Sequence, residues 1–121
     1  MDDGDARRVL TRAQRSLESQ RFEEALSVIE EGQARFPENE KVRDLYLQIH
    51  LADGVRRHRR AQDLRRDDIR ATRKKDRSEY RDGTEITRAF QEAIGSLDRV
   101  LAIQPDHAKA LMLKAGVLDR M

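Results

Sequence analysis

The stretch Phe22-Glu-Glu-Ala25-Leu26 returns later in the chain as Phe90-Gln-Glu-Ala93-Ile94. A proline follows each copy at the same distance, Pro37 after the first and Pro105 after the second, so matching positions lie 68 residues apart. Within each copy, apolar residues recur every three or four positions, which is the spacing of one helix face. A proline ends such a helix because it pushes the preceding residue out of helical geometry. The two stretches therefore predict two similar helices, each closed by its proline.

The same apolar spacing predicts further helices around these two. Residues 1–5 are expected to fray, with a first helix from Ala6 that Asp5 caps. A third helix is expected after Asn39, and Asp53-Gly54 would stop or bend it. The repeated helices are expected over about 22–36 and 86–103, and a last one is expected to begin near His107 or Ala108. The pattern predicts an all-α protein with about five to seven helices in antiparallel hairpins.

Composition agrees with a helical protein that has a thin core. Charged residues make up 40% of the 121 residues and hydrophobic residues 37%, with only 4% aromatic residues and no Trp. A core of this kind must consist mostly of Leu, Ile, Val and Ala. Such a core suits stacked helices and argues against a β-sandwich or barrel.

Charge is concentrated in the middle of the chain. Residues 55–82 contain twelve Arg or Lys and six Asp or Glu, a net charge of +6, whereas the whole chain carries +2. The remainder therefore carries −4. Large apolar residues are scarce in this segment, and its helix-forming residues predict a solvated, charged helix that frays near Lys74–Arg77.

The chain resembles the tetratricopeptide-repeat (TPR) family, whose helix–turn–helix unit is 34 residues long, half of the observed spacing. Relative to the closing prolines, Ala25 and Ala93 fall on the family's small residue in the second helix. Phe22 and Phe90 fall on its preceding aromatic position. The small position of the first helix corresponds to Ala13 and Ala115.

The resemblance is poor in the middle of the chain. In a central 34-residue frame, Arg59 would take the small position, and Asp63 and Arg66 would take packing positions, where charge is costly. Residues 55–82 are thus either a degenerate third repeat or a linking helix. The prediction is a single TPR-like α-solenoid domain over 1–121, with repeat units at about 6–53 and 84–121, the latter including the terminal helix.

The resemblance implies a non-enzymatic protein–protein interaction module, a small adaptor or scaffold that binds a protein or peptide. First helices line the concave face in this family, which makes Gln14, Tyr46 and Gln48 candidate contacts. The basic segment adds the candidates Arg56, Arg57, Arg59 and Arg60 for an acidic partner. We expect these four arginines to contribute little to folding. The apolar last helix also suggests self-association through an exposed face.

The alternative function is that of a nucleic-acid-associated accessory protein that uses the basic segment. Stacking aromatics are absent there apart from Tyr80, which favours a protein partner.

No motif in the sequence indicates catalysis, a cofactor or a metal site. Cysteine is absent, the three histidines are far apart, and neither a metalloprotease motif nor a glycine-rich phosphate loop occurs. His50 is expected at a surface or an interface. The acidic N-terminus is not a secretory signal, and no apolar run approaches the ~20 residues of a membrane span. We therefore expect a cytoplasmic protein that is not an enzyme, not bound to a membrane, and without cofactors.

Overall fold

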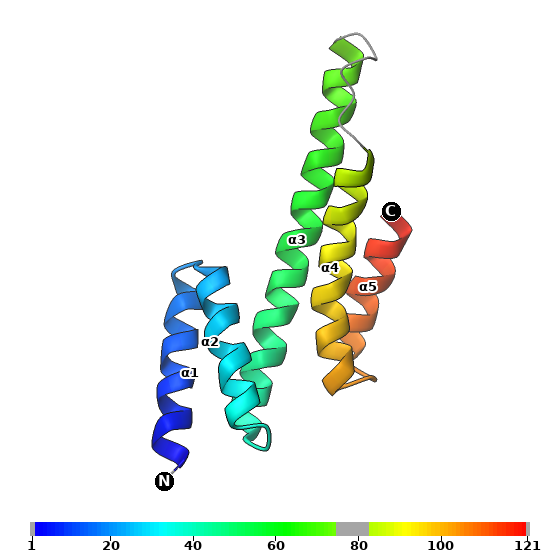
Figure 1. Ribbon diagram of the computed structural model, residues 1–121. Coiled ribbons are helices and arrows are strands. Elements are labelled where there is room, and N and C mark those ends of the chain that lie inside the picture. Colours follow the sequence, from blue (N-terminus) through cyan, green and yellow to red (C-terminus); the bar gives the residue numbers. More distant parts are fainter. Residues whose placement is uncertain (1, 75–82, 121) are drawn as a thin grey trace. The chain divides into compact units, whose positions relative to one another are not determined.

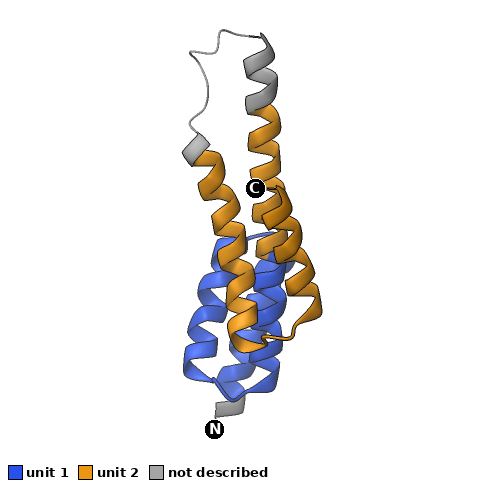
Figure 2. Ribbon diagram, turned by 90° about the vertical axis from the view of Figure 1, so that its right-hand side faces the viewer, with its two compact units in different colours: residues 1–52 blue, residues 53–121 orange. Residues whose placement is uncertain are grey.

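The computed structural model describes the backbone of residues 2–74 and 83–120, and the side chains of residues 4–67 and 85–120. These residues form five helices and no strand, which confirms the all-α prediction. The helices are α1 (Asp2–Glu18), α2 (Phe22–Arg35), α3 (Glu40–Lys74), α4 (Gly83–Ile103) and α5 (Ala108–Arg120) (Figure 1). None of the described helices is long and apolar enough to cross a membrane. The chain divides into two compact units, residues 1–52 and 53–121 (Figure 2).

The predicted ends of α2 and α4 are confirmed, and the expected start of α1 is wrong. α2 ends at Arg35 and α4 at Ile103, each two residues before its proline. α1 begins at Asp2 instead of Ala6. Acidic side chains in the first turn stabilise a helix because they lie at the positive end of its dipole. The sequence carries Asp at positions 2, 3 and 5, which favours this earlier start.

The turn from α1 to α2 contains a backbone conformation that glycine normally adopts. Gln20 has a φ of 59°, in the left-handed region. The N–H of Gln20 donates to the carbonyl of Leu17, and the N–H of Arg21 donates to the carbonyl of Ser16. This pair of bonds is the Schellman motif, which satisfies the last carbonyls of a helix. Here Gln20 stands where the motif prefers glycine.

α3 continues without interruption past the point where a stop was expected. The helix runs through Asp53 and Gly54 to Lys74, so the stop predicted there is wrong. Gly54 serves close packing: a Cβ atom at this position would lie 2.8 Å from Cδ2 of Leu97 on α4. The continuous helix also excludes a third hairpin between residues 40 and 74. The part of the basic segment up to Lys74 is helical, as predicted. Residues 75–82, with the rest of the expected fraying site and Tyr80, lie outside the described range.

The corners that follow α2 and α4 have the same hydrogen bonds, shifted by 68 residues. Three backbone bonds of the first corner have counterparts of nearly equal length in the second. The side chain before the next helix also has the same role in both. Asn39 Oδ1 accepts the N–H of Val42 at 3.1 Å, and His107 Nδ1 accepts the N–H of Ala110 at 3.2 Å. The helix-starting roles predicted for Asn39 and His107 are thus confirmed, and the sequence repeat is also a structural repeat.

The first unit is held together by small and apolar residues. α1 packs on α2, and Gly32 lies so close to Val9 that an added Cβ would come within 2.3 Å of its Cγ1. The small size of Gly32 allows this close approach. Ala13 and Ala25 have no exposed surface, as their small-residue positions predict. The buried side chains of this unit include Ala6, Ala13, Ala25, Val28, Ile29, Val42, Leu45 and Ile49.

In the second unit, the latter part of α3 and α4 form an antiparallel hairpin, and α5 packs on α4. Residue numbers rise along α3 and fall along α4 as they meet: Asp53 contacts Ser96, and Arg57 contacts Glu92. The core includes Ala61, Phe90, Ala93, Leu97, Val100, Ala110 and Val117. Ala115 is exposed, so its predicted packing role is wrong, and Ala110 is the small buried residue of α5.

Candidate functional site

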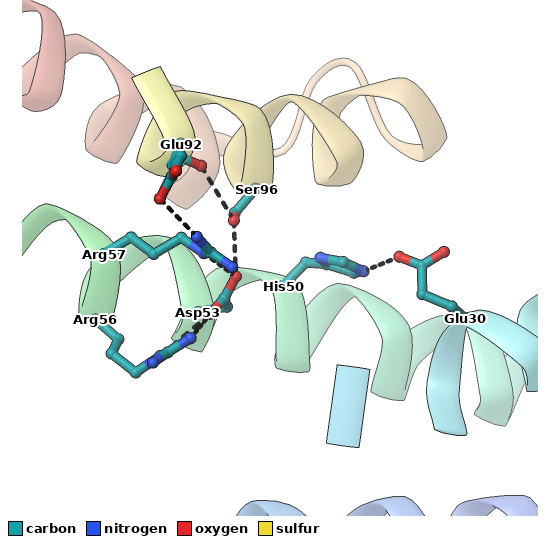
Figure 3. A network of polar contacts seen from close by, with 7 residues as sticks. All are labelled: Glu30, His50, Asp53, Arg56, Arg57, Glu92 and Ser96. Carbon is teal, nitrogen blue, oxygen red and sulfur yellow. Dashed lines mark hydrogen bonds and ion pairs between the residues drawn. The ribbon is translucent and has the colours of Figure 1, made fainter. Parts of the chain in front are cut away.

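A buried carboxylate organises the middle of α3 (Figure 3). Asp53 is 1% exposed and has three partners. Arg56 Nη2 lies 2.6 Å from Oδ1, Arg57 Nε lies 2.8 Å from Oδ2, and Ser96 Oγ on α4 donates to Oδ2 at 2.8 Å. The spacing is local, since residues three and four positions on share a helix face with Asp53. The carboxylate therefore joins α3 to α4 with its charge balanced by arginines of its own helix.

The electrostatics of the network favour the charged forms. Burial alone would raise the pKa of Asp53, but hydrogen bonds from Arg56, Arg57 and Ser96 and the charge of Arg57 outweigh it and lower the pKa below its ordinary 3.8. Burial would lower the pKa of Arg57, yet its contacts with Asp53 and Glu92 raise it. The network is thus a set of fixed charges at neutral pH, which suits a structural role better than proton transfer.

The structure gives the four basic candidates two different environments. Arg56 and Arg57 are half-buried and engaged with Asp53, and Arg57 also pairs with Glu92 at 3.0 Å. Arg59 and Arg60 are exposed. Arg56 and Arg57 thus have structural contacts that the expectation of little contribution to folding did not foresee. Sequence reasoning missed Asp53, although an aspartate followed by arginines three and four positions later is a readable signal.

The three polar candidates of the first unit are also divided. Gln14 on α1 and Gln48 on α3 are exposed, whereas Tyr46 is buried with its ring 4.3 Å from that of His50. His50 itself is fully buried, and its Nε2 lies 2.7 Å from Glu30 Oε1 on α2 (Figure 3). The surface position predicted for His50 is wrong, because α2 covers it and Glu30 supplies a polar partner. Of these three candidates, only Gln14 and Gln48 are exposed to a partner.

An arginine-lined groove of about 520 Å³ lies on α1 and the turn into α2. The charged residues of its lining are Arg7, Arg8, Arg12, Arg15, Arg21 and Glu24. We call this feature the α1 groove. A second hollow of the same unit, about 450 Å³, lies between the starts of α1 and α3 and includes Leu10 and Asn39. The arginine spacing of α1 was visible in the sequence, but the groove depends on how α2 packs beside it.

An apolar stripe on α5 is exposed in the second unit. Leu111 is 47% exposed, Met112 is 75% exposed and Leu118 is 53% exposed. Ala108 and Ala115 are exposed as well, and the spacing of these five residues places them on one helix face. We call them the α5 stripe. The opposite face of α5 packs into the unit through Ala110 and Val117.

No protein-family model matches the chain, and no curated protein or solved structure is significantly similar to it. Among the residues that the structure describes, no three His, Cys, Asp or Glu side chains are placed to hold a metal ion. The features of the molecule that bear on function are the α1 groove, the α5 stripe and the repeated corners.

Proposed function

We propose that this protein is a non-enzymatic protein-binding module, a small adaptor or scaffold built of TPR-like helical hairpins. The observation that carries the proposal is the α5 stripe. Soluble proteins rarely leave contiguous apolar side chains exposed, and such faces mark interaction sites. Leu111, Met112 and Leu118 offer a partner three large apolar side chains on one rigid helix.

The repeated corner supports the same function. In helical repeat proteins, each unit contacts its neighbours, and a terminal helix with an apolar outer face leaves a packing surface unfilled. α5 follows the second corner as α3 follows the first. The N-terminal part of α3 buries Val42, Leu45 and Ile49 within its unit, whereas α5 exposes part of its apolar surface. A partner helix that covers the α5 stripe would bury that surface.

The decisive experiment compares partner capture by the unchanged protein and a stripe variant. Cells that produce the tagged protein are treated with nuclease and cross-linked, and the retained polypeptides are identified and purified. Leu111→Ser, Met112→Ser and Leu118→Ser together remove the apolar side chains, and Arg59→Gln with Arg60→Gln is the control. We expect a purified partner to bind the parent and the control, measured by calorimetry, and to bind the stripe variant at least tenfold less tightly, about 1.4 kcal/mol.

The outcomes separate the proposal from its competitors. Equal binding to the stripe variant would contradict the proposal. Concentration-dependent dimers that the stripe variant abolishes, measured by sedimentation, would identify a second copy as the partner. The nucleic-acid alternative would be favoured if nuclease treatment abolished retention of the partner and if the Arg59/Arg60 control also lost binding. Leu111 and Leu118 are about half exposed and Ser is a poorer helix former than Leu, so we expect a modest loss of stability in the stripe variant. Thermal melts check that every variant is folded at the temperature of the binding assay.

A further inference from the structure

We propose that the α1 groove is a second binding site, one that takes an acidic, carboxylate-rich peptide segment. The site lies entirely within residues 1–52, so it does not depend on the α5 stripe of the other unit. Its lining contains five arginines and one acidic residue. That acidic residue, Glu24, already pairs with Arg21 at 3.1 Å, which leaves the remaining arginines with a strong excess of positive charge.

The arginines of α1 are placed as a continuous row. Arg8, Arg12 and Arg15 are spaced four and three residues apart and therefore share one helix face. At 1.5 Å per residue they span about 10 Å, which is the length of roughly three residues of extended peptide. Like charges at this spacing weaken a helix by a few tenths of a kcal/mol per pair.

Partners for this row are absent among the described side chains. Arg7, Arg8, Arg12 and Arg15 form no ion pair with any acidic side chain that the structure describes, in contrast to Arg56 and Arg57 on α3. From position 6 to position 17 the sequence has four arginines and no acidic residue. Arginine binds carboxylates through a planar fork of N–H donors, often with two parallel hydrogen bonds. An acidic segment would supply the missing acceptors.

The shape and composition of the groove favour a peptide over a nucleic acid. A volume of about 520 Å³ is suited to a short segment. Single-stranded nucleic acid is held largely by stacking on aromatic rings, and the lining of the α1 groove contains none. These features point to carboxylates recognised by arginine forks.

The test uses a short fluorescein-labelled peptide of alternating Glu and Ser as the probe, with binding followed by fluorescence anisotropy at low salt. The groove variant combines Arg8→Gln, Arg12→Gln and Arg15→Gln. The control combines Arg59→Gln, Arg60→Gln and Arg66→Gln, which removes the same charge from exposed positions of α3. We expect the groove variant to bind about tenfold or more weakly, and the control to stay within about twofold of the parent.

A second variant distinguishes fork geometry from charge. The Lys variant combines Arg8→Lys, Arg12→Lys and Arg15→Lys, which keeps the charge and removes the planar forks. We expect its affinity for the peptide to lie between that of the parent and that of the Gln variant. Circular dichroism checks that both variants stay folded, since Gln and Lys keep helix propensity. Equal weakening in the groove variant and the control, or no binding by the parent, would overturn the proposal. So would a single-stranded oligonucleotide that binds more tightly than the peptide through the same three arginines.

Discussion

Two helical hairpins, α1 with α2 and α3 with α4, are each followed by a corner with the same hydrogen bonds. The hairpins differ in length and in the contacts that hold their helices together. The helices of the first have 17 and 14 residues. In the second, α4 has 21 residues and pairs with the part of α3 that runs from Asp53 to Lys74. Gly32 against Val9 closes the first, whereas Asp53 with Ser96 joins the helices of the second. The local sequence around each proline is sufficient to set the corner. The length of the hairpin before it and the chemistry of its interior are free to vary.

The largest effect should come from breaking the feature that both hairpins share. Ala25→Arg and Ala93→Arg each place a long charged side chain at a position with no exposed surface. Overpacking and charge burial together should cost about 4 kcal/mol or more, a large part of the ~5–15 kcal/mol that a domain has. Thermal melts measure the loss. Ala34→Arg and Ala102→Arg, which also lie 68 residues apart but are exposed, are the controls and should melt near the parent.

A smaller loss of stability should affect the second hairpin more than the first. Asp53→Asn keeps the size of the side chain and removes the charge that Arg56, Arg57 and Ser96 satisfy. Hydrogen bonds to charged groups contribute about 1.5–3 kcal/mol, so we expect a loss of about 2 kcal/mol in chemical denaturation. Amide exchange should quicken in α4 more than in α2. Equal quickening in both helices would contradict the assignment of Asp53 to the second unit alone.

The same variant should change the response to acid. Because the pKa of Asp53 is lowered on folding, its contribution is present above the unfolded value of about 3.9 and is lost as pH falls through the folded value. Burial, followed by the charge of Arg120, also lowers the pKa of His58, so its contribution is lost below about pH 6.5. Melts from neutral to acidic pH should show both losses in the parent. The Asp53→Asn variant should keep the His58 loss and lack the Asp53 share below about pH 4.

Substitution of the arginines on α3 should cost stability according to the contacts that each one makes. Arg57→Gln removes a half-buried group that pairs with Asp53 and Glu92, and we expect a loss of about 1 kcal/mol. Arg59→Gln with Arg60→Gln removes two exposed charges and should cost less than about 0.5 kcal/mol. Chemical denaturation of the two variants tests this order. If the double variant lost more stability than Arg57→Gln, the structural reading of the Asp53 network would be wrong.

The smallest predicted effect is a gain confined to the first hairpin. Gln20→Gly relieves a left-handed backbone conformation that side chains disfavour. After allowance for the greater freedom of glycine in the unfolded chain, the gain should be about 0.5 kcal/mol. Chemical denaturation detects it, with Ser19→Gly as the control, which lacks a left-handed backbone and should lose stability.

Prediction from sequence succeeded for the prolines and caps, which are local signals, and failed at Gly54 and His50, whose roles depend on a distant neighbour. The prolines after α2 and α4 mark their ends correctly, and the caps Asn39 and His107 are in place. Gly54 was taken for a stop because glycine often ends helices, but contact with Leu97 explains it. The candidates Arg59 and Arg60 are exposed on α3 and so are accessible to a partner. The α1 groove was not predicted, because it depends on how α2 packs beside α1.

The sequence by itself determined that this protein is all-α, where the helices beside each proline end, and that Ala13, Ala25 and Ala93 pack without exposed surface. These properties follow from backbone geometry and apolar spacing within a few turns of helix. Only the tertiary structure decided that α3 is one helix through Asp53, that His50 is buried, and that one face of α5 is exposed. Such properties depend on which residues of another helix pack against them. That neighbour decides whether a polar side chain such as His50 is buried beside a partner and whether an apolar face is covered.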